Sequence, residues 1–333
     1  TGANTFMLTV LKGEYGAALG RTAELQAGID RATASLQGAA TIELQTGTVA
    51  VTGDTLDVDV TVTNLTGHKL PTGYPEGRRM WIELVAADVL GIPFFVSGDY
   101  DDSTATLTED PQLRIYETHH GAHGDGPGFH LVLNNRIYSD TRIPPRGFVP
   151  DLDTEPLGRT YELLPDSTLA HWDEASFRIP VPTNVQGPVQ VRATLRYQTA
   201  SRDYIEFLRD ENVSGPDPHD RNYPAAPSRG QKMHDLWTQY GKSTPVDMVT
   251  ADTVVPVRVP PEAPDGLIAV NDHAAIHLGW SPLPLGVNEI RVLRTSWGDY
   301  PQLGSNGSGV AAPLEIPDYD DALAAGWPVS YTH

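Results

Sequence analysis

Cysteine is absent from this 333-residue chain. Its absence excludes disulfides, iron–sulfur clusters, thiolate zinc sites and the C-x-x-C-H motif through which c-type haem is covalently attached. No apolar stretch approaches the roughly 20 residues that a helix needs to cross a bilayer. The sequence starts at Thr1 with neither an initiator methionine nor a signal peptide, which is typical of a processed chain or a fragment.

Basic residues are also few, because 23 Lys and Arg stand against 43 Asp and Glu, for a formal net charge of −20. This imbalance disfavours nucleic acid and anionic membrane surfaces as partners. Hydrophobic residues make up 39% of the chain, which is too many for a disordered protein. Glycine (31) and proline (28) are frequent, and the many turns they imply point to a β-rich fold.

The periodicity of the apolar residues changes along the chain. Residues 1–38 are expected to form two helices with a break in the glycine-rich first half. From residue 41 the apolar positions alternate with polar ones, as in Leu56, Val58, Val60 and Val62, and such alternation predicts strands with one buried face. Further strands are expected at 80–88, 112–117, 129–138, 175–181, 188–198 and 252–259, and short helices near 203–211 and 229–240.

These elements predict a mainly β chain of the α+β class in three parts. A helical segment (1–38) leads into an antiparallel β-sandwich-like domain with short helical insertions (39–259). The third part (260–333) follows a stiff, proline-rich linker. Its segments PEAPDGLIAV, AAIHLGWSPLP and VNEIRVLRTSWGDYP resemble the start of a fibronectin type III domain, with Trp280 as the core anchor. About 70 residues are too few for the seven strands of that sandwich. We therefore expect a partial domain, which either is completed by strands from another chain or was cut or only partly built.

The loop NLTGHKLPTGYPEGRRMW at 64–81 is the most distinctive stretch of the chain. It carries His68, Lys69, Tyr74, Arg78 and Arg79 among several glycines and prolines. A histidine and two arginines on one rigid loop indicate a binding site. The alternative is a plain connection in which Arg78 and Arg79 pair with local carboxylates.

Four segments in the same order resemble the C-terminal, haem-free β-rich region of secreted bacterial multihaem c-type cytochromes of the tetrahaem-cytochrome-like family. They are NLTGHKLPTGYPEGRRMWIEL (64–84), DTRIPPRGF (140–148), RYQTASRDYIEFLRDEN (196–212) and LWTQYGKSTPVDM (236–248). The opening GANTFMLTVL resembles the helix that follows the last haem site in that family. This chain departs from the family because it holds no haem-attachment site.

The resemblance implies that His68 is a distal axial ligand to a neighbouring haem, with Lys69, Tyr74, Arg78 and Arg79 beside it. The haem c would come from a partner chain or from a severed N-terminal part. Neutral imidazole is a standard axial ligand, so the chemistry is reasonable. In the alternative interpretation, His68 hydrogen-bonds a loop carbonyl.

Two further clusters could bind metal ions. His119, His120 and His123 offer three imidazoles within five residues, which suits zinc, copper or nickel, although a solvated glycine-rich loop explains them as well. Separately, oxygen ligands such as those of Asp99, Asp101 and Asp102 suit calcium, although the spacing is not that of an EF-hand and an ordinary solvated turn is the alternative. A calcium site at these three aspartates is therefore a hypothesis from ligand chemistry and does not depend on a known motif.

No nucleophile elbow, H-E-x-x-H, P-loop or dinucleotide fingerprint occurs in the sequence. We therefore expect a non-catalytic β-rich module of an extracellular multihaem cytochrome, which packs against haems of the same assembly, shields them and supports electron transfer. The expected location is extracellular, periplasmic or at the surface of a bacterial cell. The alternative is an extracellular adhesion or filament subunit with no redox role, completed by strand donation from a neighbour. A secreted hydrolase is a third possibility, and it requires a concave pocket with a carboxylate of raised pKa.

Overall fold

The computed structural model describes residues 4–72, 77–212 and 228–260, and beyond them only the backbone of five short strands. The chain divides into two compact units, Thr1–Val257 and Arg258–His333. The helical segment at the start of the chain thus belongs to the same unit as the β domain. The sequence-based boundary after residue 259 lies close to this division. Within the described ranges, no helix combines the length and apolarity that a membrane span requires.

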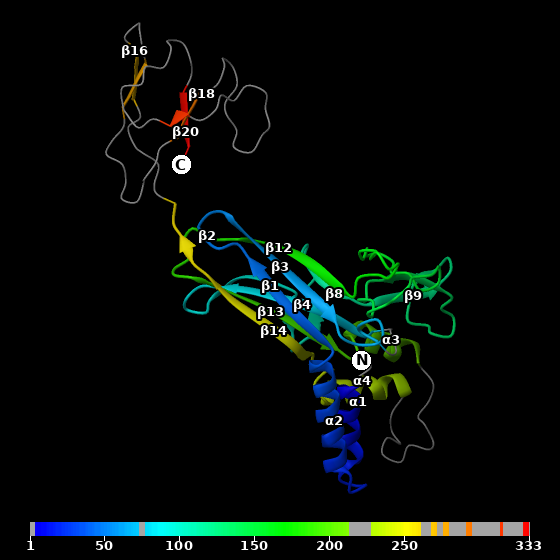
Figure 1. Cartoon of the computed structure of the whole chain (residues 1–333). Helices are drawn as coiled ribbons and strands as arrows, with labels where there is room; N and C mark the ends of the chain where they lie inside the picture. The colour runs from blue at the N-terminus through cyan, green and yellow to red at the C-terminus, as the bar shows by residue number, and fades with distance from the viewer. Residues whose placement is uncertain are drawn as a thin grey trace. The chain divides into compact units, whose positions relative to one another are not determined.

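Two antiparallel sheets form the body of the first unit (Figure 1). The first sheet has the order β1-β3-β12, from β1 (Ala40–Thr46), β3 (Thr55–Asn64) and β12 (Trp172–Pro180). The second has the order β14-β13-β4-β5, from β14 (Val246–Val255), β13 (Val189–Gln198), β4 (Arg79–Ala87) and β5 (Pro93–Ser97), and β8 (Arg114–Tyr116) also pairs with β4. The expectation of a β-rich α+β fold is confirmed at this level.

Alternation along the strands explains the main hydrophobic core. In β3 the side chains of Val58, Val60 and Val62 are fully buried, whereas the adjacent Asp57 and Asp59 face outward. They share one core cluster with inward residues of the second sheet such as Ile82 and Leu195. Each sheet has one apolar face because every second residue of its strands is apolar, and the two sheets bury these faces by packing on each other.

The N-terminal helices form a hairpin next to the sheets. The hairpin comprises α1 (Thr5–Leu11), the π-helical turn η1 (Lys12–Gly16) and α2 (Thr22–Gln37). Asn4 caps α1 by accepting a hydrogen bond from the Met7 N–H at 2.9 Å. The break falls where Gly20 adopts a φ of +61°, so the expected interruption of the helix is confirmed.

Two more helices follow β13, namely α3 (Arg202–Glu211) and α4 (Arg229–Gln239). Both begin at serine caps, since Ser201 accepts from the N–H of Tyr204 (3.3 Å) and Ser228 from that of Gln231 (3.0 Å). At Gly230 an added Cβ would lie 2.0 Å from the carbonyl oxygen of Leu208, so the two helices touch through backbone. With α1 they enclose a second hydrophobic cluster, whose members include Phe6, Val10, Trp81, Ile205 and Trp237.

Shorter strands lie in the segments that connect the main elements of the first unit. They are β2 (Ala50–Val51), β6 (Tyr100–Asp101), β7 (Thr106–Leu107), β9 (Thr118–Ala122), β10 (Gly126–Pro127), β11 (Arg136–Asp140) and β15 (Val257–Arg258). The strand expected at 129–138 is wrong in its first half, because turns occupy 129–135 and β11 starts at Arg136. The strand expected at 252–259 in fact starts at Val246. The strands β5, β6, β7, β9 and β10 were not expected, and most of them are too short to show alternation.

In the second unit the structure describes two antiparallel groups of strands. One is β16 (Ile268–Asn271) with β17 (Ile276–Gly279), and the other is β18 (Arg291–Arg294) between β19 (Leu314–Glu315) and β20 (Val329–Thr332). These pairings agree with a β unit but do not establish a fibronectin type III topology. The predicted core anchor Trp280 lies outside the described residues.

Candidate functional site

The distinctive loop is anchored to the sandwich at its start. The side chain of Asn64, at the end of β3, donates to the carbonyl oxygens of His68 (2.8 Å), Ile143 (3.0 Å) and Pro144 (3.0 Å). The backbones of Leu70 and Ile143 exchange two hydrogen bonds of 2.9 Å. The first and second of the four family-like segments are therefore paired with each other.

Lys69 is part of a buried ion cluster. Its Nζ lies 2.7 Å from Oδ2 of Asp140 and donates to the carbonyl of Thr154 at 2.6 Å. Arg142 also binds Asp140, with both bonds under 3 Å. Burial alone raises the pKa of Asp140, but the bonds from Arg142 and Lys69 outweigh it and hold the pKa below the usual value. Lys69 therefore fixes the loop to β11 and does not present its charge to a ligand.

Arg78 and Arg79 stand at the other end of the loop, where β4 begins. Arg78 is only 7% exposed, and its Nη1 donates to the carbonyl of Thr72 at 2.5 Å. Its buried Nε has no hydrogen-bond partner. The guanidinium of Arg79 donates to Oε1 of Gln198 at 2.8 Å and lies 5.7 Å from the Trp81 ring. Burial lowers the pKa of Arg79, although Glu117, Tyr100 and Asp203 act in the opposite direction.

Neither arginine forms an ion pair within the described residues. Among the described residues, the alternative interpretation that Arg78 and Arg79 pair with local carboxylates finds no support. Two guanidinium groups that are largely removed from water and lack a carboxylate partner are costly, so they are unusual in a purely structural loop.

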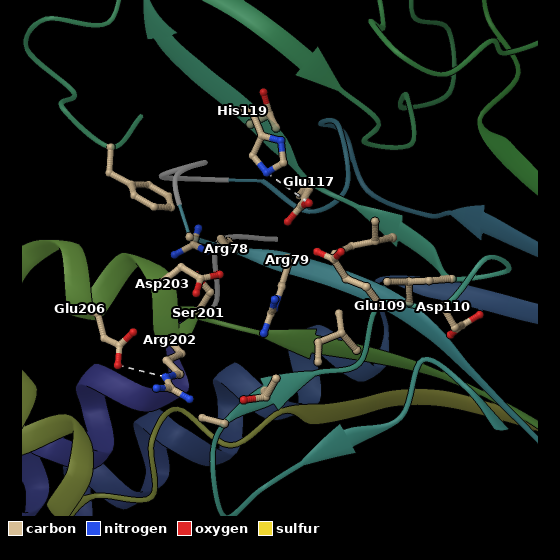
Figure 2. A pocket seen from close by; sticks show the side chains of 18 residues that line it. Arg78, Arg79, Glu109, Asp110, Glu117, His119, Ser201, Arg202, Asp203 and Glu206 are labelled. Atoms are coloured by element: carbon tan, nitrogen blue, oxygen red, sulfur yellow. Dashed lines mark hydrogen bonds and ion pairs between the residues drawn. The ribbon is translucent and has the colours of Figure 1, made fainter. Parts of the chain in front are cut away.

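These arginines line a pocket of about 810 Å³ on the outer side of the second sheet (Figure 2). Its walls come from the start of β4, the β7 turn, β8, β9 and α3. The lining residues are Gly77, Arg78, Arg79, Ala105, Thr106, Leu107, Glu109, Asp110, Leu113, Ile115, Glu117, Thr118, His119, Phe129, Ser201, Arg202, Asp203 and Glu206.

Most charged groups of the pocket other than the two arginines already have partners. Nε2 of His119 lies 3.2 Å from Oε1 of Glu117, and this bond raises the pKa of His119 although burial opposes it. Arg202 pairs with Glu206 at 3.0 Å on α3. Asp110 accepts hydrogen bonds from the side chain and backbone of the 97–98 turn. Figure 2 shows Arg78 and Arg79 between the His119–Glu117 pair and the residues of α3.

Two carboxylates at the mouth have no such partner. Glu109 and Asp203 are exposed, and neither has a hydrogen bond or ion pair with another described residue. The pocket therefore combines a buried and a half-buried arginine with an exposed acidic rim. Sequence reasoning identified the two arginines, but it missed that Glu109, Phe129 and Asp203 join them, because these residues come from separate segments of the chain.

The loop histidine lies apart from the pocket lining. His68 is exposed, and only its backbone carbonyl is engaged, by the side chains of Asn64 and Thr66. Its imidazole has no hydrogen bond to any described residue, so the alternative of a bond to a loop carbonyl finds no support there. Tyr74, the fifth residue of the predicted site, lies outside the described residues.

The predicted metal clusters do not assemble into sites. His119 and His120 are successive residues of β9, so their side chains leave opposite faces of the strand, and His123 follows in the next turn. Within the described ranges, no group of three or more His, Asp or Glu side chains is arranged to hold a metal ion.

The acidic turn has a local structural role. Asp101 accepts hydrogen bonds from Ser103 and Thr104, and these lower its pKa to about 2. Asp99 and Asp102 do not join it in a three-ligand group. A preformed calcium site at these three aspartates is therefore not seen.

Comparisons with known proteins assign no family to this chain. No family model matches the sequence, and no curated protein is significantly similar to it. The functional argument therefore depends on the residues and on their arrangement.

Proposed function

We propose that this chain is the non-catalytic β-rich module of an extracellular multihaem c-type cytochrome, which packs against haems of the same assembly, shields them and supports electron transfer. The haems would belong to a partner chain or to an N-terminal part, because this chain has no cysteine. Haem supplies the electron-carrying chemistry, and the residues of this chain supply packing, orientation and exclusion of water.

The convergence of the family-like segments carries the proposal. The carbonyl of Gly77, in the first segment, accepts from the N–H of Ser201 in the third at 2.6 Å. Gln198 of the third segment donates to the carbonyl of Ser243 in the fourth at 3.1 Å. Segments that lie up to about 180 residues apart in sequence thus form one region at one end of the sandwich, as an interaction surface requires.

The N-terminal helices reach the same region. The hydroxyl of Tyr240, in the fourth segment, donates to Oε1 of Glu14 at 2.7 Å, and Thr5 lies within hydrogen-bond distance of Thr199 (3.5 Å). Phe6 is buried in the hydrophobic cluster that α3 and α4 help to build. A haem-bearing part joined to α1 would therefore start beside the residues that resemble the cytochrome family.

The exposure of His68 supports its role as a ligand to a haem held elsewhere. Its imidazole is exposed, while the hydrogen bonds to its backbone carbonyl fix the position of the loop. An exposed ring on an anchored backbone can reach a partner group without a large change in the fold.

The test is a visible absorption spectrum of the natively purified assembly, with the intact mass of every chain present. We expect a Soret band and a C-x-x-C-H-bearing chain or part. His68→Ala should then shift the haem spectrum, whereas His123→Ala, at another exposed histidine, should leave it unchanged. A haem-free preparation that contains only this chain would refute the proposal, and polymerisation of that preparation would favour the structural-subunit alternative.

A further inference from the structure

The pocket beside β4 holds a charge pattern that the packing of the fold does not explain. The buried guanidinium of Arg78 and the half-buried one of Arg79 line it without forming an ion pair, and the exposed carboxylates of Glu109 and Asp203 stand at its rim. We propose that it binds a small zwitterionic carboxylate of amino-acid or short-peptide type, with the carboxylate at the arginines and the ammonium group at the rim.

The floor of the pocket is suited to a carboxylate. A guanidinium presents a planar fork of N–H donors that matches the two oxygens of a carboxylate. The Nε of Arg78 is buried and has no partner. Arg79 donates only to a neutral amide and lies near an aromatic ring, while Glu117 and Asp203 act on it without forming an ion pair. A bound carboxylate would give Arg79 the charged acceptor that it lacks, and it would offset the effect of burial that lowers the pKa of Arg79.

The rim selects against a simple anion. Five carboxylates and three guanidiniums line the pocket, so an inorganic anion meets net negative charge as it enters. Glu117, Glu206 and Asp110 already have partners, which leaves Glu109 and Asp203 to receive a positive group. A ligand that carries both charges fits this division, because each end meets its opposite.

The remaining walls determine the size and the polarity of the ligand. Leu107, Leu113, Ile115 and Phe129 provide apolar surface in the lining. The volume of about 810 Å³ lies within the range of roughly 300–1,000 Å³ that small-molecule sites occupy. An apolar side chain on the ligand, as in leucine or a leucine dipeptide, would cover this surface.

This inference does not depend on the proposed cytochrome role. A propionate of a partner haem offers the same carboxylate chemistry to the arginines, but it carries no ammonium group for the acidic rim. The two sources are separable, because a free zwitterion should bind the chain in the absence of any haem.

Isothermal titration of the full-length chain with leucyl-leucine tests the proposal. We expect saturable binding that weakens about tenfold or more when the ligand is N-acetylated or C-terminally amidated, since either change removes one charge-assisted contact. Arg79→Gln should weaken leucyl-leucine binding by about tenfold or more for the same reason. Arg178→Gln, at an exposed arginine on β12, is the matched control and should have no effect.

Glu109→Gln is the second variant, for use if the arginine variant does not fold. The Glu109 side chain is exposed, so this substitution should leave the fold intact. It should weaken the binding of leucyl-leucine but not that of its N-acetyl derivative. The proposal is overturned by absence of saturable binding to the folded chain, by equal affinity for the N-acetylated ligand, or by binding that needs a haem-bearing partner.

Discussion

Asp173 offers the sharpest test of how the two sheets are held together. It lies on β12 of the first sheet, and its carboxylate side chain is only 4% exposed. It accepts from Arg114 on β8 of the second sheet, with bonds of 2.7 and 2.6 Å. Arg159 (2.9 Å) and the hydroxyl of Tyr116 (2.9 Å) complete the cluster. We predict that Asp173→Asn strongly destabilises the first unit while leaving its size and shape unchanged.

The magnitude follows from the charges that remain after the substitution. The asparagine amide keeps one oxygen acceptor and turns an N–H₂ group toward donors, so two guanidiniums lose their counter-ion. Breaking a buried ion pair by removing one partner costs about 3–5 kcal/mol. For a unit of this size, 1 kcal/mol corresponds to about 2–4 °C in melting temperature, so we expect a drop of about 10 °C.

Urea unfolding followed by tryptophan fluorescence measures the change in free energy. Asp57→Asn is the matched control, because Asp57 and Arg178 form a 3.7 Å pair in which both side chains are 78% exposed. That pair should contribute less than about 1 kcal/mol. Ordinary surface substitutions change the free energy of unfolding by up to about 0.5 kcal/mol. If Asp173→Asn and Asp57→Asn lower it by amounts that differ by no more than this, the reasoning that the Asp173 cluster stabilises the contact between the sheets is refuted.

Further predictions concern the region of the site. Gly77 has a φ of +72°, and a Cβ there would lie 2.4 Å from the Cβ of Tyr204 on α3. Gly77→Ala should therefore lower the free energy of unfolding in urea by about 1–3 kcal/mol. Gly91→Ala, at φ +77° with open space around it, should cost less. The lowered pKa of Asp140 contributes stability above about pH 4 that is lost as the pH falls through the folded-state value, so Asp140→Asn should flatten the acid side of the stability profile. By NMR titration, His119 should have a midpoint above about 6.5, and Glu117→Gln should bring it back toward that value.

Local periodicity explains what the sequence could predict about the fold. Strands with one buried face, such as β3 and β13, alternate over ten residues, and long alternation has no other common cause. The expected strand at 175–181 missed the start of β12 because Asp173 occupies an inward position that the pattern reserves for apolar residues. Its burial depends on arginines from other segments, and a local pattern carries no information about such partners.

The site was predictable only in part, for a similar reason. Arg78 and Arg79 stand out because they are adjacent on a glycine-rich loop. Their lack of carboxylate partners, the acidic rim at Glu109 and Asp203, and the apolar wall arise only when α3 and the β7 turn fold against β4. Glu117, between β8 and β9, is the carboxylate that acts most on Arg79, but it is engaged by His119 and forms no ion pair with the arginine.

The position of β4 explains why a pocket forms where it does. Met80, Ile82 and Leu84 are fully buried in the core between the sheets, while Trp81, on the opposite face, is fully buried in the cluster beneath the helices. Because a strand turns successive side chains to opposite faces, Arg79 must leave the sheet on the same side as Trp81. The helices cover Trp81 and stop short of enclosing Arg79, so the edge of the second hydrophobic cluster becomes the floor of the pocket. Changes that shift α3 on the sheet should therefore alter ligand binding before they alter the sandwich core.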